Sequence, residues 1–350
     1  MNIDSGFDLP QAWVQAGREI DETIPSNQPS TTGTAGPGRD TQHRRGMERL
    51  PVGKCRRMPY LITSDQAKIA YDDVGRGRPL LLVHGWATHA GFFRPQVEGL
   101  SQSFRIISVD LRGHGRSRAA EGDLSIDLLA RDIVELADHL DLNDLLVVGW
   151  SMGAMVLWRA LLDGLSSRVA GMISIDMAPR VINGDGWDLG LRGSSAAKSA
   201  RQSPAAMIAN WPSVGPRVAG RIFAEGREVE QAILRRWAET EVADSDPVAM
   251  ARLWASLTAQ DFRPLLPGIS VPVLVTHGKL SRLYCQDTAQ ALASLLAQAV
   301  TIGFDRSGHA PHLEEPDLFN STLTRFAATL PPAGGADAPG AGRDEPAGAQ

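Results

Sequence analysis

Ser151 has the residue type and the setting of a nucleophile. It is the central residue of Gly-Trp-Ser-Met-Gly at 149–153, which follows the apolar run 145–148 and opens a segment with helical spacing. The order strand, G-x-S-x-G, helix predicts a tight turn that lifts the serine hydroxyl clear of a sheet. It also sets the hydroxyl at a helix N-terminus, where developing negative charge is favoured. The sequence therefore predicts that Ser151 attacks an electrophilic carbon.

His309 is the candidate general base. It follows the apolar run 299–302 in the triplet Ser-Gly-His at 307–309. A general base must reach the serine hydroxyl from a loop at the same edge of the sheet, and His309 has that position and the expected chain order. His312 is expected to be exposed. The remaining histidines lack a comparable setting and are expected to be structural or solvated: His43, His89, His114, His139 and His277.

An oxyanion-binding loop is predicted after the apolar run 80–83. His-Gly-Trp at 84–86 follows this run directly. The backbone N–H of Trp86, together with that of Met152 after the nucleophile, is expected to bind the oxyanion. The His84 side chain is expected to be buried and to hold the loop in place. The glycine-containing run Asp110 to Ser117 is expected to shape the fold near the site and to have no catalytic role.

A fold must hold these candidate residues in place, and the spacing of apolar residues predicts which fold that is. Strands are predicted at 80–83, 106–109, 145–148, 172–175, 271–275 and 299–302. Helical spacing occupies the intervals 125–140, 152–162 and 288–297. Alternating strands and helices predict an α/β fold, with a mostly parallel central sheet covered by helices on both faces. The chemistry of such sheets lies at the carboxyl ends of the strands, where the candidate residues fall.

The chain is predicted to have a core with one insertion and two tails. Residues 58–177 and 263–330 would form the core, and 178–262 a helical cap inserted after the strand that ends near residue 175. The cap is expected to contain helices at 222–237 and 247–257, with its tryptophans mostly in the cap core. Residues 1–57 and 331–350 are of low complexity and are expected to be disordered.

Composition excludes several classes of function. The 350 residues carry a formal net charge of −5 and no basic face that a nucleic acid would need. Cys55 and Cys285 have no disulfide or metal-ligand spacing. No stretch approaches the roughly 20 apolar residues of a membrane span, and no signal peptide is recognisable. We expect a cytoplasmic protein without metal or organic cofactor, and its oligomeric state stays open.

Taken together, the motifs resemble the α/β-hydrolase superfamily, in its capped branch with esterases, perhydrolases, dehalogenases and epoxide hydrolases. HGW, DLRGHGRS, GWSMG and SGHAPHLEEP occur in the family's order, and the resemblance covers about Tyr60 to Leu330. It implies an α/β-hydrolase fold. Dehalogenases and epoxide hydrolases of this branch carry aspartate at the elbow, so Ser151 implies acyl chemistry.

The third member of the triad departs from the family's common pattern. After the strand 271–275 the family usually shows H-G-x-x-D, but Ser281 stands at the position of the acid. Asp176 ends the preceding strand in the pattern I-D-x-A-P. This pattern resembles that of a subset of esterases in the superfamily that place the acid after this strand. The alternative is that Asp176 only caps the turn that follows. Asp305 is too close to His309 in sequence, and Asp287 is expected on a helix that points away.

The resemblance implies a serine carboxylesterase-like hydrolase that cleaves small-molecule carboxylic esters of small or medium acyl groups through a Ser-His-Asp triad and an acyl-enzyme. An acyltransferase or perhydrolase would use the same triad and is the first alternative. A low-turnover ligand-binding protein on a hydrolase scaffold is the second. A lipase or polyester depolymerase would differ only in the size of the substrate.

Overall fold

The computed structural model describes residues 59–119, 123–195 and 203–331. Both tails expected from the sequence lie outside this part of the chain, apart from Pro331. The structure therefore bears on the core and on the insertion between its halves, but not on the tails, Cys55 or His43.

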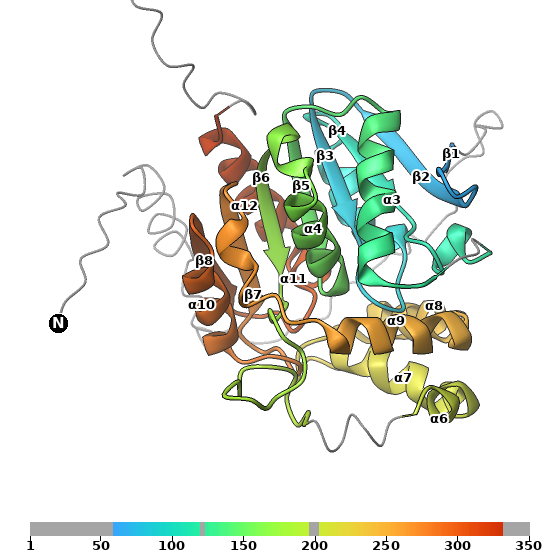
Figure 1. Ribbon diagram of the computed structural model, residues 1–350. Helices are drawn as coiled ribbons and strands as arrows, with labels where there is room; N and C mark the ends of the chain where they lie inside the picture. The colour runs from blue at the N-terminus through green and yellow to red at the C-terminus, as the bar shows by residue number, and fades with distance from the viewer. Residues whose placement is uncertain (1–58, 120–122, 196–202, 332–350) are drawn as a thin grey trace, which may run out of the picture.

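One sheet of eight strands organises the molecule, in the order β1-β2-β4-β3-β5-β6-β7-β8 (Figure 1). The strands are β1 (Tyr60–Ile62), β2 (Lys68–Gly75), β3 (Arg78–Val83), β4 (Phe104–Val109), β5 (Leu145–Trp150), β6 (Val169–Ile175), β7 (Val273–Gly278) and β8 (Ala299–Phe304). β1 and β2 pair antiparallel, as do β2 and β4, and the other neighbours are parallel. All six strands expected from apolar runs are present, and the predicted fold class is confirmed.

Helices cover both faces of the sheet. They are α2 (Arg94–Leu100), α3 (Ile126–His139), α4 (Met152–Leu162), α10 (Gln286–Leu295), α11 (Pro311–Glu314) and α12 (Pro316–Thr329), with 3₁₀ turns at Ala90–Phe93, Gly115–Ser117, Leu165–Arg168 and Leu266–Gly268. α3 packs against α4 on one face, and α2 packs against α12 on the other. This cover explains why β5 and β6 are buried along their whole length, since a parallel sheet excludes water from both faces.

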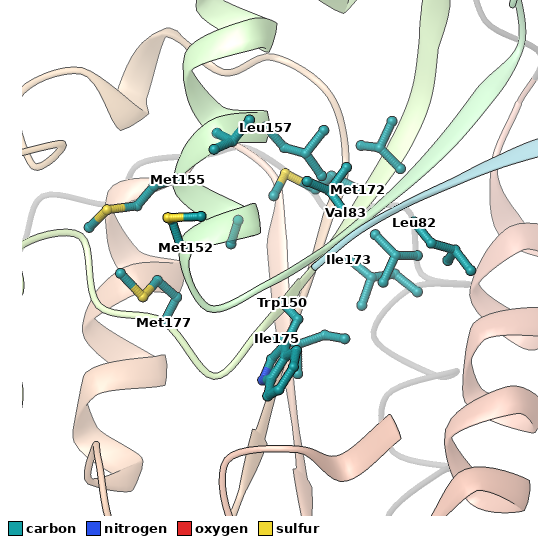
Figure 2. Close-up of a cluster of buried hydrophobic side chains, with 14 of the residues drawn as sticks. Leu82, Val83, Trp150, Met152, Met155, Leu157, Met172, Ile173, Ile175 and Met177 are labelled. Carbon is teal, nitrogen blue, oxygen red and sulfur yellow. The ribbon is translucent and has the colours of Figure 1, made fainter. Parts of the chain in front are cut away.

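The strands that present the site rest on a dense apolar core. Figure 2 shows side chains of β3, β5 and β6 packed with the first turns of α4, among them Val83, Trp150, Met152 and Ile175. Side chains packed at this density sit in fixed rotamers and transmit displacement to their neighbours. The turn between β5 and α4 is therefore held from both sides.

The described residues between β6 and β7 form four helices, which lie at the carboxyl ends of the strands (Figure 1). These cap helices are α6 (Pro204–Ala209), α7 (Trp211–Ile222), α8 (Ala232–Ala243) and α9 (Pro247–Ala259). α9 agrees with the helix expected at 247–257. The helix expected at 222–237 is present only over 232–237, where α8 begins, and the expectation was wrong for 223–231. α7 ends at residue 222 because Phe223 is extended (φ −98°, ψ 157°), and Gly226 then takes a left-handed φ of 79°.

Candidate active site

Ser151 lies in a strained turn between β5 and α4. Its φ of 54° and ψ of −122° are rarely adopted by a residue with a side chain and cost of order 1–3 kcal/mol. Its N–H donates to the carbonyl of Ile175 over 2.9 Å. A Cβ on Gly153 would lie 2.2 Å from the carbonyl oxygen of Val83, and one on Gly149 would lie 2.6 Å from the Cα of Ala154. Only glycine fits at these two positions, and the turn presents the Ser151 side chain at the edge of the sheet.

His309 and Asp176 form a buried pair at the same edge. The Nδ1 of His309 lies 2.7 Å from the Oδ2 of Asp176, and their side chains are 4% and 2% exposed. Asp176 directly follows β6 with a φ of 43°, and its N–H donates to the carbonyl of Thr276 over 2.8 Å. An Nδ1–H that donates to the carboxylate leaves Nε2 without a proton and able to accept one. The structure thus brings together the base and the acid expected from the sequence.

Ser281 is the third member of this cluster. Its Oγ donates to the Oδ2 of Asp176 over 2.7 Å and accepts from the N–H of Leu283 over 3.3 Å. The hydroxyl at the family's usual acid position therefore binds the carboxylate that directly follows β6. Sequence reasoning assigned Ser281 no role, because the residue type does not reveal where the hydroxyl points.

The backbone of the His309 loop is held by groups from distant elements. The His309 N–H donates to the carbonyl of Ile222 over 2.7 Å, and its carbonyl accepts from the Nε1 of Trp150 over 2.8 Å. Ile222 ends α7, and Trp150 ends β5. His309 is thereby tied both to α7 and to the strand that precedes Ser151.

Glu314 joins the same loop to the cap helices. Its carboxylate accepts from the N–H of Gly308 over 2.7 Å, the N–H of Ala224 over 2.8 Å and the Nε2 of Gln231 over 2.7 Å. Burial raises the pKa of this carboxyl group, while the donors lower it in part. Sequence reasoning missed Glu314, although it lies in the motif that contains His309, because its partners Gln231 and Ala224 are 83 and 90 residues away.

The predicted oxyanion loop lies beside Ser151. A Cβ on Gly85 would lie 3.2 Å from the Cβ of Ser151, so the loop after β3 approaches the serine closely. Within the described residues, the backbone N–H of Trp86 and that of Met152 donate to no other group. The Trp86 indole donates to the carbonyl of Met250 in α9 over 3.0 Å. Two N–H groups next to the serine therefore stay available for an oxygen atom of a ligand.

His84 has the structural role expected of it. Its side chain is fully buried, its Nε2 accepts from the N–H of Leu111 over 3.0 Å, and its Nδ1 lies 2.8 Å from the carbonyl oxygen of Gly85. The ring joins the loops after β3 and β4 and fixes the residue that precedes Trp86. Burial lowers its pKa to about 3, so the ring is neutral at pH 7.

Ser151 and His309 open into one cavity of about 590 Å³ between the sheet edge and the cap helices. Its apolar lining comes from Ile182, Leu191, Met207, Val214, Val218, Ile222, Trp254, Leu257 and Leu283. Among the tryptophans of the insertion, Trp254 lines this cavity, whereas Trp187 and Trp211 are buried and Trp237 packs on Phe92 with ring centres 4.5 Å apart. A chain of several methylene groups fits such a space.

The comparisons with known proteins decide the family. Residues 80–322 match the family described as "Alpha/beta hydrolase family". The chain belongs to the α/β-hydrolase family. The AB hydrolase superfamily protein YisY of Bacillus subtilis is 27% identical over 77% of this chain and 98% of its own length. A pimeloyl-[acyl-carrier protein] methyl ester esterase of Nitrosomonas europaea is 30% identical over 73% of this chain and 98% of its own.

Solved structures of other proteins share the fold of this chain. An esterase from Exiguobacterium antarcticum superposes with a TM-score of 0.70 at 26% identity, covering 77% of this chain and 99% of its own. An enol-lactonase from Burkholderia xenovorans gives a TM-score of 0.63 at 25% identity, covering 77% and 100%. This α/β-hydrolase is thus an enzyme of the esterase-like type. Its described residues contain no helix long and apolar enough to cross a membrane and no cluster of side chains suited to a metal ion.

The exposure expected of His312 in this α/β-hydrolase was wrong, because the side chain is fully buried. Its ring packs among Phe93, Trp150 and Phe319, with ring centres 4.7 to 6.0 Å apart. His312 lies in the short helix α11, whose first three residues, Pro311 to Leu313, are all buried. Burial lowers the pKa of His312 well below its usual range, and neither ring nitrogen has a hydrogen-bond partner among the described residues.

Buried neutral histidines predict that the α/β-hydrolase core loses stability in mild acid. Burial lowers the pKa of His84 to about 3 and that of His114 to about 4, against 6.5 for an unperturbed ring. Below pH 6.5 the unfolded chain takes up protons that the folded chain excludes. Between pH 7 and pH 5, each of these two rings therefore lowers the free energy of unfolding by about 2 kcal/mol. Glu314 has the opposite effect on stability. Its pKa is raised in the folded chain, so the folded chain takes up a proton more readily than the unfolded chain as the pH falls.

Urea unfolding at pH 7, 6 and 5 checks this expectation, with His312→Phe as the informative variant. Phenylalanine removes a buried titratable ring that has no partner to lose, so its advantage over wild type should grow as the pH falls. His139→Gln, at an exposed position, is the matched control. Parallel curves for wild type and His312→Phe from pH 7 to pH 5 would contradict the prediction.

The contact between Ser281 and Asp176 predicts how the loss of the Ser281 hydroxyl changes activity. Ser281→Ala removes a hydrogen bond to a buried carboxylate, an interaction worth about 1.5–3 kcal/mol. We expect kcat for ester hydrolysis to fall about tenfold, with circular dichroism unchanged. Ser294→Ala is the control, because this exposed hydroxyl bonds only within its own helix. A kcat for Ser281→Ala within twofold of wild type would show that the hydroxyl does not support the site.

Proposed function

We propose that this enzyme hydrolyses carboxylic esters of small or medium acyl groups through an acyl-enzyme on Ser151. One observation carries the proposal. The buried 2.7 Å contact between His309 and Asp176 lies at the sheet edge where the strained turn presents Ser151, and base and nucleophile line one cavity. The named esterases among its relatives support the same reaction class.

The proposed reaction follows from these positions. His309 removes the proton from Ser151, whose Oγ attacks the ester carbonyl carbon. The carbonyl oxygen becomes an oxyanion and accepts hydrogen bonds from the N–H groups of Trp86 and Met152, each worth about 3 kcal/mol of barrier. His309 then protonates the leaving alcohol. Asp176 keeps the imidazole in the productive tautomer and stabilises its charged form.

The second half of the reaction repeats these roles with water. His309 takes a proton from a water molecule, the hydroxide attacks the acyl carbon, and the carboxylic acid leaves as Ser151 regains its proton. The triad needs no metal or organic cofactor for either half. We also propose that residues 178–262 act as a cap domain that covers the acyl group, and that the enzyme works in the cytoplasm.

The proposal is tested with p-nitrophenyl esters of two- to twelve-carbon acids. We expect a burst of p-nitrophenolate, an acyl adduct in the intact mass, and a preference for acyl chains that fit the cavity. Competing alcohols added to the assay separate a hydrolase, whose product stays the free acid, from an acyltransferase, whose product becomes the new ester. If no ester gives a burst or turnover and a fluorophosphonate probe leaves Ser151 unlabelled, the proposal fails.

A further inference from the structure

The wall of the cavity carries positive charge without a matching negative charge. Arg192, Arg217 and Arg221 line the same space as Ser151 and His309. No aspartate or glutamate is among the described residues that line it. None of these three arginines pairs with a carboxylate anywhere in the described part of the chain. An uncompensated cluster of guanidinium groups makes the potential inside such a space positive.

Arg221 is the innermost of the three by burial. It is half-buried, whereas Arg192 and Arg217 are exposed. Its Nη2 donates to the carbonyl of Arg282 over 3.0 Å, so the side chain is held by a neutral partner. Burial and the nearby charge of Arg282 both lower the pKa of Arg221. A guanidinium placed among low-polarity walls and beside another cation is unfavourable by itself, and an anion beside it would remove that cost.

Arg221 is also close to the reacting groups. It precedes Ile222, whose carbonyl accepts the N–H of His309 over 2.7 Å. The charge of Arg221 acts on Tyr284, and the ring of Tyr284 lies with its centre 6.0 Å from that of His309. Arg217 stands one turn earlier on α7, so the two guanidinium groups share one face of the helix.

We propose that the cavity takes esters that carry a second, ionised oxyanion group, a carboxylate or a phosphate, and that Arg221 binds that group. The planar fork of a guanidinium matches either oxyanion with two parallel hydrogen bonds. The apolar lining holds the methylene chain between the anion and the ester carbonyl. Arg217 and Arg192, at more exposed positions, steer the anion into the cavity. This inference rests on the proposed ester hydrolysis at Ser151.

The test compares charged and neutral esters of equal length. Monomethyl esters of unbranched dicarboxylic acids are paired with methyl esters of the corresponding monocarboxylic acids, and kcat/KM is measured for each. We expect wild type to prefer the charged ester, and the preference to shrink as salt is raised. Arg221→Gln should lower the ratio of charged to neutral kcat/KM by about 10- to 100-fold. Methyl esters that end in a phosphonate show whether phosphate-type groups are accepted equally.

Arg236→Gln is the matched control, because Arg236 is an exposed arginine of the cap helices that does not line the cavity. This variant should keep the wild-type ratio. Arg221→Lys, which keeps the charge but not the fork, should fall between wild type and Arg221→Gln, and it covers the case in which Arg221→Gln does not fold. The inference is overturned if wild type shows no preference for the charged ester, or if the ratio is the same in Arg221→Gln and wild type.

A binding measurement separates this inference from the proposed function. Calorimetric titration of wild type and Arg221→Gln with the free dicarboxylate and the free monocarboxylate needs no turnover. Hydrolysis of both esters at equal rates, abolished in Ser151→Ala, would leave the esterase proposal standing and overturn the anion site. Selective binding of the dicarboxylate through Arg221, without hydrolysis of any ester, would support the anion site and overturn the esterase proposal.

Discussion

Ser151→Ala is expected to lower kcat for p-nitrophenyl ester hydrolysis about 10⁶-fold, the scale of effect found when the nucleophile of a triad is removed. The loss follows because the proposed covalent intermediate can no longer form, while the cavity and the two N–H groups beside it remain. Alanine accepts the backbone of the turn as well as serine does, since both residues carry a Cβ at a φ of 54°. The thermal midpoint should therefore stay close to that of wild type.

The measurement is a steady-state assay together with fluorophosphonate labelling. Ser321→Ala, which removes an exposed hydroxyl from α12, serves as control and should retain full activity and labelling. If Ser151→Ala kept more than about one hundredth of the wild-type kcat, the nucleophile would have to be another group.

Asp176→Asn is expected to lower kcat about 10⁴-fold, as the same change does to a triad aspartate elsewhere. Two donors, the Nδ1 of His309 and the Oγ of Ser281, converge on one carboxylate oxygen. An asparagine can turn its amide N–H toward the imidazole, which places the ring proton on Nε2 and removes the acceptor that Ser151 needs. It also removes the negative charge that stabilises the protonated ring.

The control for this change is Asp305→Asn. Asp305 is the aspartate closest to His309 in sequence, but its carboxylate pairs with Lys279 over 2.6 Å and is exposed. The Asp305→Asn variant should retain the wild-type kcat. The reverse pattern, with Asp305→Asn inactive and Asp176→Asn active, would move the acid to the loop after β8. In the Asp176→Asn background, Ser281→Asp returns a carboxylate to the family's usual position and should restore part of the lost activity.

Much of the fold was predictable because its signals are local. Each central strand is a short apolar run, and the elbow motif is contiguous, so strand order along the chain and the place of Ser151 followed directly from the sequence. The position of Asp176 was also predictable, because the carboxyl ends of parallel strands meet at one edge. Its catalytic role stays a prediction until the variants are assayed.

The features that escaped prediction depend on contacts between distant segments. The interval 222–237 has helical spacing, yet the chain extends at Phe223, and the next N–H, that of Ala224, donates to Glu314, 90 residues away. His312 was expected at the surface, but aromatic rings from α2, β5 and α12 or their flanks enclose it. Side-chain direction, which decides both the role of Ser281 and the burial of His312, is not encoded in a residue's type.

The carboxylate of Glu314 sets a limit on how this enzyme can be re-engineered. Because it binds the chain beside His309 and the chain that leaves α7 at once, the segment between β6 and β7 is not an interchangeable module. A graft that replaced this segment with one from another hydrolase, to change which esters are accepted, would remove the N–H of Ala224 and the amide of Gln231 together. It would then leave the buried carboxyl group of Glu314 beside the His309 loop without two of its hydrogen-bond donors. Successful chimeras should therefore be those that carry over residues 222–231 with the native loop.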